Sequence, residues 1–410
     1  MRGIYLVQYF PPEKASGLQL VEDLLEGFAK RGWYINLYTP TPTRGVTVDQ
    51  RKLYVNGQIE EKYDGKVIIH RMRLYREGTN PIARAIRYVI FSIQCFWKAV
   101  TVSADFIFTG SGPPTQGVIV GLAKKFSKKK VIYNLQDIFP DSLVNAGVCR
   151  EDSIVMKIGR KMENYTYRNA DVIITISNDM KENIVNKGVN PDKVEVVCNW
   201  IDVDKIRPVD EMQNKLFDEF SLSRDKFKVV YAGNLGKVQG VEVIIDAAEL
   251  LKNIKNIYFI IFGNGSEEEK IKQKISEKGL MNISVFPLQP VERVSEVYSL
   301  GNVSIIPCKP GSGIAGMPSK TWSIMAAGSA IIGSFDIGSE LDKTLRKAEC
   351  GYCVEAGNAK ALSDAILEMS RDCSAVRKMG EKAREYAVVN VSKEKALDKY
   401  IKIMEKSING

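Results

Sequence analysis

Apolar and polar positions follow two rhythms along this chain. Short apolar runs, each followed by a polar turn, predict buried strands. In the first half these runs occupy 4–9, 34–38, 66–70, 105–108, 131–135, 172–176 and 194–197. Over 18–30, apolar residues instead recur every three or four positions, which predicts a helix. Strands that alternate with helices are typical of parallel sheets, so we predict an α/β fold.

Turn-forming residues interrupt this alternation between 199 and 208, after which it starts again. The second set of predicted strands occupies 228–231, 257–262, 283–286, 303–306, 330–332 and 351–354. Each set is long enough for a doubly wound sheet of its own. We therefore predict two Rossmann-like domains, one over 1–198 and one over 199–384.

Length and composition fit two globular domains. The chain has 410 residues, of which 45% are hydrophobic and 26% charged, so each half can bury its own core. No window approaches the run of about 18 apolar residues that a membrane-spanning helix needs. The chain starts with a short apolar run and then Pro11-Pro12, which predicts a strand and a loop rather than a signal peptide. We therefore expect a cytoplasmic protein.

Charge and the rarer residues restrict the chemistry. The single histidine, His70, excludes multi-histidine zinc or iron sites, and the seven cysteines are scattered, odd in number and lack paired metal-ligand spacing. A net charge of +9 favours a polyanionic partner, which can be nucleic acid, an anionic membrane face or a pyrophosphate-bearing substrate. Neither zinc-finger spacing nor the aromatic and basic pattern of an RNA-binding sheet occurs, so we expect no nucleic-acid partner.

In parallel sheets, ligands bind at the carboxyl ends of the strands. In the first half, the loop after the first strand contains Ser16 and Gly17, which open a helix and either approach an anion or only connect two elements. The segment Gly110-Ser111-Gly112-Pro113-Pro114 forms a stiff turn that we expect to shape the acceptor side. Asp137 follows the strand 131–135 and is our candidate polar residue for the acceptor. The alternative is that Asp137 or Asp141 caps the next helix.

In the second half, a glycine-rich turn follows the strand at 228–231 and precedes a helix. It contains Gly233, Asn234, Gly236 and Lys237, and the combination of glycines, a cation and a helix start predicts a pyrophosphate site. Gly263-Asn264-Gly265 repeats the arrangement after the next strand and could lie against a nucleotide base.

The segment 309–320 is the richest in glycine and ends with Pro318, Ser319 and Lys320 before a helix predicted over 321–327. A proline in the first turn leaves neighbouring amides free, and Ser319 and Lys320 add a hydroxyl and a charge there. We predict an anion site. The alternative is an ordinary capped helix with a solvated lysine.

The order of these motifs resembles glycosyltransferase family 4, the retaining group with two Rossmann domains, over nearly the whole chain. The resembling segments are Phe10-Pro11-Pro12 with Ser16-Gly17, Gly233-Asn234-Leu235 with Gln239-Gly240, Gly263-Asn264-Gly265, Ala326-Ala327-Gly328, Ser339-Glu340-Leu341 and Cys350-Gly351-Tyr352. The chain is most similar to the N-acetylfucosamine transferases of bacterial O-antigen and capsule synthesis. The segments typical of that subgroup are Gln136-Asp137 with Pro140-Asp141-Ser142-Leu143, Gly233 to Gly240, and Pro318-Ser319-Lys320. The resemblance implies a GT-B fold, with the domains facing a cleft and a closing helix, 385–410, that crosses back to the first domain.

The chain departs from the family pattern at several positions. Ala315 and Ser323 stand where the family carries two glutamates. By analogy, Glu340, followed by Leu341, is then the remaining carboxylate for the donor ribose, and we expect it at the end of the strand from 330. The family's arginine and lysine of the phosphate loop are here Asn234 and Gln239, and its acceptor-side histidine is also missing, with Gln136-Asp137 in that region.

The resemblance implies a retaining glycosyltransferase that moves a sugar, N-acetylated in our interpretation, from a UDP-sugar to a lipid-linked glycan acceptor. Lys237, Lys320 and backbone amides would stabilise the charge that grows on the leaving diphosphate. Asp137 would orient the acceptor hydroxyl or act as its base. The UDP-sugar is a co-substrate, and the scheme needs neither a metal nor a cofactor.

Two features leave alternatives open. Five arginines precede an apolar helical pattern at 86–100, which is compatible either with a peripheral face on the anionic inner membrane, suited to a polyprenyl diphosphate-linked acceptor, or with a core-facing helix. These arginines are Arg71, Arg73, Arg76, Arg84 and Arg87. The rival functions are a UDP-N-acetylglucosamine 2-epimerase and a catalytically inactive sugar-nucleotide-binding subunit, the latter suggested by Ala315 and Ser323.

Overall fold

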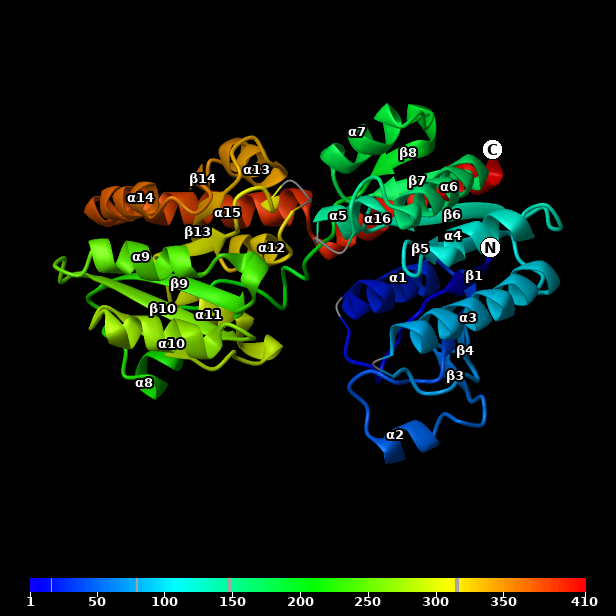
Figure 1. The fold of residues 1–410 in the computed structure, drawn as a ribbon, viewed down its shortest axis with the longest axis horizontal. Helices are drawn as coiled ribbons and strands as arrows, with labels where there is room; N and C mark the ends of the chain where they lie inside the picture. Colours follow the sequence, from blue (N-terminus) through cyan, green and yellow to red (C-terminus); the bar gives the residue numbers. More distant parts are fainter. Residues whose placement is uncertain (16, 79, 146–148, 314–316) are drawn as a thin grey trace. The chain divides into compact units, whose positions relative to one another are not determined.

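The computed structural model describes residues 1–15, 17–78, 80–145, 149–313 and 317–410. These residues form two compact units (Figure 1). The first contains Met1–Asn199 and Ala396–Gly410, and the second contains Trp200–Lys395. Each unit is an α/β layer structure with a parallel sheet at its centre, so the predicted pair of Rossmann-like domains is confirmed.

The first unit is built on an eight-stranded sheet in the order β3-β4-β2-β1-β5-β6-β7-β8. Its strands are β1 (Arg2–Leu6), β2 (Tyr34–Pro40), β3 (Ile59–Lys62), β4 (Val67–Met72), β5 (Phe106–Gly110), β6 (Lys130–Leu135), β7 (Val172–Thr175) and β8 (Val194–Val196). Its helices are α1 (Leu18–Lys30), α2 (Val48–Lys52), α3 (Pro81–Thr101), α4 (Thr115–Ala123), α5 (Asp141–Asn145), α6 (Ile154–Asn169), α7 (Asn178–Asn186) and the short η1 (Pro191–Lys193).

One strand of this sheet departs from the predicted all-parallel pattern. β3 pairs with β4 in the antiparallel sense at the sheet edge. Its sequence, Ile-Glu-Glu-Lys, carries a single apolar residue, so no apolar run reveals it. Its edge position explains this composition, because a strand there needs to bury little surface and charged residues protect its free edge.

The second unit is built on a six-stranded parallel sheet in the order β11-β10-β9-β12-β13-β14. Its strands are β9 (Phe227–Asn234), β10 (Ile257–Asn264), β11 (Ile283–Phe286), β12 (Val303–Pro307), β13 (Ala330–Phe335) and β14 (Gly351–Glu355). Its helices are α8 (Leu216–Glu219), η2 (Lys237–Gln239), α9 (Glu242–Leu250), α10 (Glu268–Glu277), η3 (Val291–Arg293), α11 (Val294–Ser299), α12 (Lys320–Ala326), α13 (Glu340–Ala348), α14 (Ala359–Arg371) and α15 (Cys373–Asn390).

Strand order creates one switch point in each sheet. Chain order reverses between β1 and β5 in the first sheet and between β9 and β12 in the second. At such a point the loops of neighbouring strands run in opposite directions and leave a crevice beyond the carboxyl ends. The predicted glycine-rich turns after β9 and β12 therefore flank the switch point of the second sheet.

The last helix, α16 (Lys393–Asn409), returns the chain to the first unit. The buried Tyr400 hydroxyl donates to Asn134 Oδ1 at 3.1 Å, at the carboxyl-terminal half of β6. Leu397 packs against Gly27 of α1. A Cβ added at Gly27 would lie 3.3 Å from the Leu397 side chain. The chain thus ends on the sheet on which it began.

Residues 385–392 lie before the returning helix, and the second unit extends to Lys395. The reason is that α15 is anchored there along its length. Arg384 donates to the carbonyl oxygens of Ile206 and Ala326, both at 2.8 Å. Gly380 packs so tightly that an added Cβ would lie 2.2 Å from the carbonyl oxygen of Gly328.

Candidate functional site

The loops after β9 and β10 lie side by side. Gly233 and Asn234 pair with Gly263 and Asn264 in register, and Leu235 N donates to the carbonyl oxygen of Asn264 at 2.7 Å. The structure therefore brings these four predicted site residues together at the carboxyl edge of the second sheet.

Glycine is required here by the packing of one loop on the other. A Cβ added at Gly265 would lie 2.6 Å from Asn234 Oδ1, and one at Gly263 would lie 2.7 Å from the carbonyl oxygen of Gly233. Gly233 also has a φ of 148°, which disfavours any other residue. The result is an edge where backbone, not side chain, forms the surface.

Lys320 places its amine above this edge. Its Nζ lies 4.1 Å from the centre of the Tyr231 ring, and an added Cβ at Gly233 would lie 2.8 Å from that nitrogen. Tyr231 is itself fixed, because its hydroxyl donates to the carbonyl oxygen of Asn234 at 2.7 Å. A cation over an aromatic face gains some stabilisation from the ring.

The surroundings of Lys320 leave its charge without a counter-ion. Burial lowers the pKa of Lys320 from 10.5 to about 8. Within the described residues, no carboxylate forms an ion pair with it. A desolvated cation of this kind, at a sheet switch point, is a strong candidate for binding an anion.

The other predicted cation, Lys237, has a different setting. It is exposed at the start of η2 and makes no contact with Lys320 in the part of the chain that the structure describes. The turn around it is nevertheless fixed. A Cβ at Gly240 would lie 2.8 Å from the backbone of Cys308, and Lys309 N donates to the carbonyl oxygen of Val238 at 3.1 Å. The loops after β9 and β12 are thus joined.

The turn before α12 differs from the predicted cap. Helix α12 begins at Lys320, one residue earlier than predicted, and Ser319 has helical dihedral angles without a side-chain capping bond. The exposed Ser319 and the half-buried Pro318 therefore precede Lys320 as part of the surface of this edge. Ala315 lies outside the described residues.

The predicted position of Glu340 is wrong. β13 ends at Phe335, and Glu340 is the first residue of α13 rather than the end of the strand. Its side chain is half-buried and already has an interaction within the chain. The Leu341 side chain is fully buried in the core, so only its backbone could face a ligand.

Asp336 is a residue that the sequence reasoning missed. It directly follows β13, and its carboxylate accepts hydrogen bonds from Gly311 N at 2.9 Å and Gly313 N at 2.7 Å. It therefore holds the glycine-rich loop that leads to Lys320. The sequence feature that could have identified Asp336 is its position, as an acidic residue immediately after a buried strand of this sheet.

In the first unit, the loops after β5 and β6 are also joined. The Ser111 hydroxyl oxygen accepts from the backbone nitrogens of Gln136 and Asp137, both at 3.2 Å. The Asp137 side chain is exposed beyond the end of β6. Asp141 differs, because it forms ion pairs with Arg160 and, at 2.7 Å, with Lys187. Asp141 therefore has a structural role, and Asp137 remains open to a ligand.

The first loop of this unit also faces open space. Gly17 caps α1 with a φ of 77°, and an added Cβ there would meet nothing within 4 Å. Ser16 lies outside the described residues. The buried carboxylate of Glu13 fixes the neighbouring loop, because it accepts from Thr43 N at 2.7 Å and Arg44 N at 3.1 Å.

Helix α3 has one buried and one exposed apolar face. One face enters the core through Phe91, Cys95 and Ala99, all without exposed surface. The opposite face carries an exposed apolar stripe, which consists of Ile82, Ile86, Val89, Ile90, Ile93 and Trp97. The core-facing interpretation is confirmed for the first face. The membrane interpretation of the exposed face stays a prediction. Among the described residues no helix has the length and apolarity to cross a membrane.

Two of the arginines predicted for a membrane face are buried instead. Arg71 forms an ion pair with Glu60 at 2.7 Å, and Arg87 donates to the carbonyl oxygen of Tyr75 at 3.0 Å. Both side chains are buried and donate hydrogen bonds to backbone carbonyl groups of other loops.

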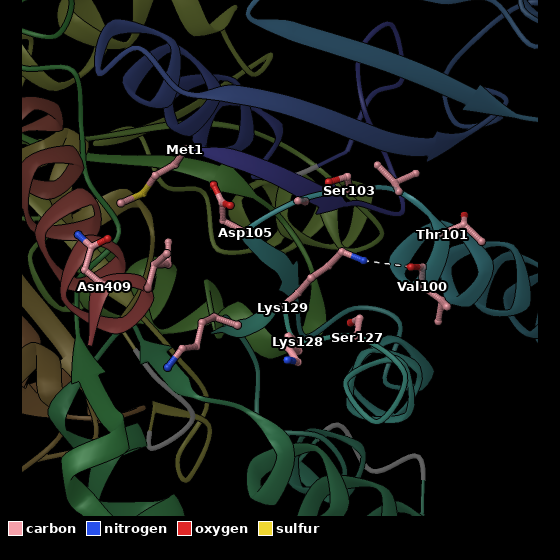
Figure 2. Close-up of a pocket in the computed structure, with 13 residues that line it drawn as sticks. Met1, Val100, Thr101, Ser103, Asp105, Ser127, Lys128, Lys129 and Asn409 are labelled. Atoms are coloured by element: carbon pink, nitrogen blue, oxygen red, sulfur yellow. Dashed lines mark hydrogen bonds between the residues drawn. The ribbon is translucent and has the colours of Figure 1, made fainter.

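A cavity of about 660 Å³ lies at the amino ends of the strands of the first sheet, away from the carboxyl ends where the predicted site residues lie. It is near Met1, Asp105 and Asn409 (Figure 2). There Lys129 donates to the carbonyl oxygens of Ala99 and Val100 and so provides hydrogen-bond partners for carbonyl groups in the last turn of α3. This lysine is occupied by a structural role, and none of the predicted site residues lines the cavity.

Comparisons with known proteins agree for both units. Residues 19–205 match the family Glycosyltransferase Family 4, and residues 212–386 match Glycosyl transferases group 1. The chain is 24% identical to the putative colanic acid biosynthesis glycosyl transferase WcaI of Escherichia coli, over 97% of this chain and 98% of the relative. It is 23% identical to the capsular polysaccharide biosynthesis glycosyltransferase CapM of Staphylococcus aureus, over 83% and 90%.

Solved structures share the fold at lower identity. Sucrose-phosphate synthase from Thermosynechococcus elongatus superposes with a TM-score of 0.76 and 17% identity, over 99% of this chain and 98% of that one. HepE from Anabaena, in complex with UDP, gives 0.74 and 13%, over 99% and 100%.

Proposed function

We propose that this glycosyltransferase, which contains a family 4 and a group 1 glycosyltransferase domain, transfers a sugar from a UDP-sugar to a lipid-linked glycan in bacterial surface polysaccharide synthesis. Similarity along almost the whole chain to WcaI, and over most of it to CapM, supports the polysaccharide class. The UDP complex of HepE supports uracil as the base of the donor. The N-acetylated sugar and the N-acetylfucosamine transferase subgroup remain part of the proposal.

The observation that carries the donor assignment is the Lys320 amine above Gly233 at the β9/β12 switch point. A diphosphate bound there would meet a lysine whose desolvated charge has no counter-ion among the described residues, and glycine backbone that permits close approach. Lys237 and the backbone of Gly236 are exposed or partly exposed on the adjoining turn and would complete the phosphate contacts. Gly263, Asn264 and Gly265 would lie against the nucleotide.

The chemistry follows from where charge develops. As the bond between the anomeric carbon and the diphosphate breaks, negative charge grows on the leaving group, and fixed cations lower the energy of that state. In our scheme Lys320 does this without a metal or a cofactor. The configuration at the anomeric carbon is retained, with the leaving phosphate receiving the acceptor's proton. Asp137, exposed at the end of β6, orients the acceptor hydroxyl.

The acceptor side is supported by the exposed apolar stripe of α3. A row of exposed apolar side chains along one helix face is typical of contact with a membrane or a partner protein. We propose that it rests on the cytoplasmic face of the membrane, where a polyprenyl-linked acceptor would be found. Two half-exposed or exposed arginines, Arg84 and Arg76, lie near its start and add positive charge there.

The test is a transfer assay with UDP-N-acetyl sugars, a short-chain lipid-linked glycan and EDTA. We expect a glycosylated product whose new bond keeps the donor's anomeric configuration by NMR. Epimerisation of the UDP-sugar without an acceptor would instead identify an epimerase. UDP binding with no turnover of any donor would identify an inactive binding subunit.

A further inference from the structure

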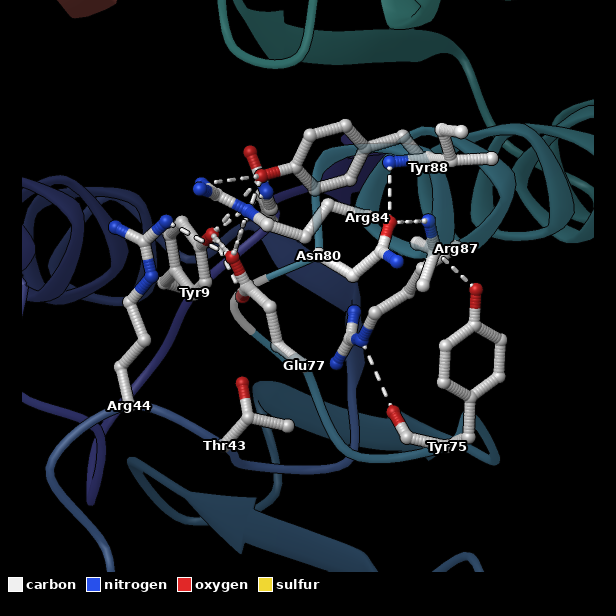
Figure 3. A network of polar contacts seen from close by, with 12 residues as sticks. Tyr9, Thr43, Arg44, Tyr75, Glu77, Asn80, Arg84, Arg87 and Tyr88 are labelled. Carbon is white, nitrogen blue, oxygen red and sulfur yellow. Dashed lines mark hydrogen bonds and ion pairs between the residues drawn. The ribbon is translucent and has the colours of Figure 1, made fainter.

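A pocket of about 570 Å³ opens at the carboxyl edge of the first sheet. Figure 3 shows the network of polar contacts that includes Thr43, Arg44, Glu77 and Arg84. The lining of the pocket comes from the loop after β2, the loop after β4 and the first turn of α3. The lining residues are Thr43, Arg44, Arg76, Glu77, Gly78 and Arg84. None of these belongs to the site proposed for the donor.

A single carboxylate organises two of the arginines. Glu77 is almost buried, with 7% of its side chain exposed, and Glu77 Oε1 lies 3.0 Å from Arg44 Nη2 and 3.1 Å from Arg84 Nε. The Tyr9 hydroxyl donates to the same carboxylate at 3.0 Å. Each of the two arginines keeps 40% of its side chain exposed. Glu77 thus fixes two guanidinium groups that retain N–H donors for a ligand.

More positive charge lies beneath the pocket. Arg87 is buried and donates to the carbonyl oxygens of Tyr75 and Thr41, and its Nη1 has no hydrogen-bond partner in the described structure. Arg51 donates to the carbonyl oxygens of Pro42 and Leu74. Burial, and then the charges of Arg87 and Arg76, lower the pKa of Arg51. The region therefore carries more cationic charge than its carboxylates neutralise.

The fifth arginine, Arg76, is the least committed. It lines the pocket and is exposed, and it has no ion-pair partner among the residues that the structure describes. The other nearby carboxylate, Glu13, is occupied by backbone donors from Thr43 and Arg44. An anion in the pocket would be the missing partner of this cluster.

We propose that the arginine pocket binds the diphosphate that joins the acceptor glycan to its lipid, through Arg44, Arg76 and Arg84. This inference rests on the proposed function and names the anionic group of its acceptor. Planar guanidinium groups suit phosphate oxygens because they donate two parallel hydrogen bonds. A diphosphate carries enough charge to balance several arginines, unlike a single carboxylate.

The setting of the pocket fits such a ligand. α3 starts at the pocket and exposes apolar side chains along its length, including Ile86, Ile93 and Trp97. A lipid attached to a diphosphate in the pocket would have this apolar surface beside it. The sugar end would remain at the carboxyl edge of the same sheet, where Gly17 and Asp137 also lie.

The test compares Arg76→Gln and Arg84→Gln with the wild-type enzyme on two acceptors. Both carry the same glycan, one on a short prenyl diphosphate and one on an uncharged alkyl chain. For the diphosphate acceptor we expect KM to rise at least about tenfold in each variant, the loss typical of a charge-assisted hydrogen bond. For the uncharged acceptor, and for the UDP-sugar, we expect changes below about twofold. Arg150→Gln is the control, because that side chain is 88% exposed and lines none of the pocket.

Other outcomes would overturn the proposal. Equal effects on both acceptors would show a structural role for these arginines. Unchanged acceptor KM with weaker binding to vesicles of phosphatidylcholine and phosphatidylglycerol would assign the pocket to bulk anionic lipid instead. If the wild type transfers no sugar at all, titration calorimetry with inorganic pyrophosphate still decides the matter. Binding to the wild type that is lost in Arg76→Gln supports an anion site, and equal binding or none to both refutes it.

Discussion

The two units use the same kind of sheet edge in opposite ways. In the second unit the edge is made of glycine backbone, with one desolvated lysine above it and no nearby carboxylate paired with that lysine in the described chain. In the first unit the edge is made of long side chains, with two arginines fixed by the buried Glu77. A strand-end crevice can thus be made cationic either by bringing backbone close or by placing guanidinium groups.

The difference suggests a division of tasks. Backbone and one lysine suit a group that is the same in every donor, the nucleotide diphosphate. Arginines on two loops and the start of a helix can be exchanged without disturbing the sheet, which suits a site for the acceptor. Variants of each edge should therefore affect one ligand and leave the other unchanged.

The largest expected effect is from Lys320→Met. Removing the one charge that the described residues place above Gly233 should weaken UDP binding roughly 10- to 100-fold at pH 7, the range for a lost charged hydrogen bond. The melting temperature without ligand should not fall, because a desolvated charge is removed. Titration calorimetry measures the first and calorimetric unfolding the second.

The matched control is Lys237→Met, which removes an exposed lysine of the adjoining turn. We expect it to weaken UDP binding less than Lys320→Met. A larger effect at position 237 would mean that the exposed turn, not the buried amine, holds the diphosphate.

The next effect is a dependence on pH. Because the pKa of Lys320 is lowered to about 8, its charge is lost as pH rises above 8, and UDP affinity should fall about tenfold between pH 7 and 9. Without ligand, the dependence of stability on pH has the opposite sign. The unfolded lysine keeps its proton up to about pH 10.5, so the free energy of unfolding should rise between about pH 8 and pH 10.5. Lys320→Arg, whose guanidinium stays protonated, should show no fall in UDP affinity. An equal fall in that variant would assign the dependence to another group.

A smaller effect is expected from Gly233→Ala. The new Cβ would lie 2.8 Å from Lys320 Nζ and would displace the amine, weakening UDP binding about fivefold, within the few-fold to tenfold range of a partly lost contact. Gly279→Ala is the control, because Gly279 also has a positive φ but an added Cβ meets nothing within 4 Å. Both variants should lose roughly 1 to 3 kcal/mol of stability, the cost of a side chain at positive φ, and only the first should lose UDP affinity.

The smallest effect concerns the exposed stripe of α3. Ile93→Ser should weaken binding to anionic vesicles about threefold, since roughly half of one aliphatic side chain is exposed there. UDP affinity should not change. Met281→Ser, which alters an exposed side chain of the second unit, is the control for vesicle sedimentation. An equal loss of vesicle binding in both variants would show that α3 has no particular role in membrane contact.

Sequence reasoning located the sheets better than the site. Apolar runs identified every strand except β3, whose polar edge sequence gives no signal. Burial of Arg71 and Arg87 could not be foreseen, because their partners are a carboxylate on β3 and carbonyl groups of other loops. The role of Asp336 likewise depends on the tertiary approach of the 311–313 loop.

The glycine motifs illustrate why site residues are harder to predict than strands. Gly263 and Gly265 stand where an anion-binding turn needs glycine, yet packing of the two loops also requires glycine there. Lys320 could be predicted as a cation at a helix start. Its burial and its position over Tyr231 follow only from the folded sheet.

The central claim, that the edge formed by β9, β10 and Lys320 holds a nucleotide diphosphate, is tested most directly by titration calorimetry of UDP and uridine in EDTA. We predict that the wild type binds UDP at least about tenfold more tightly than uridine, and that Lys320→Met loses most of this preference while binding uridine as before. An undiminished preference in the variant, or no binding of UDP to the wild type, would contradict the account.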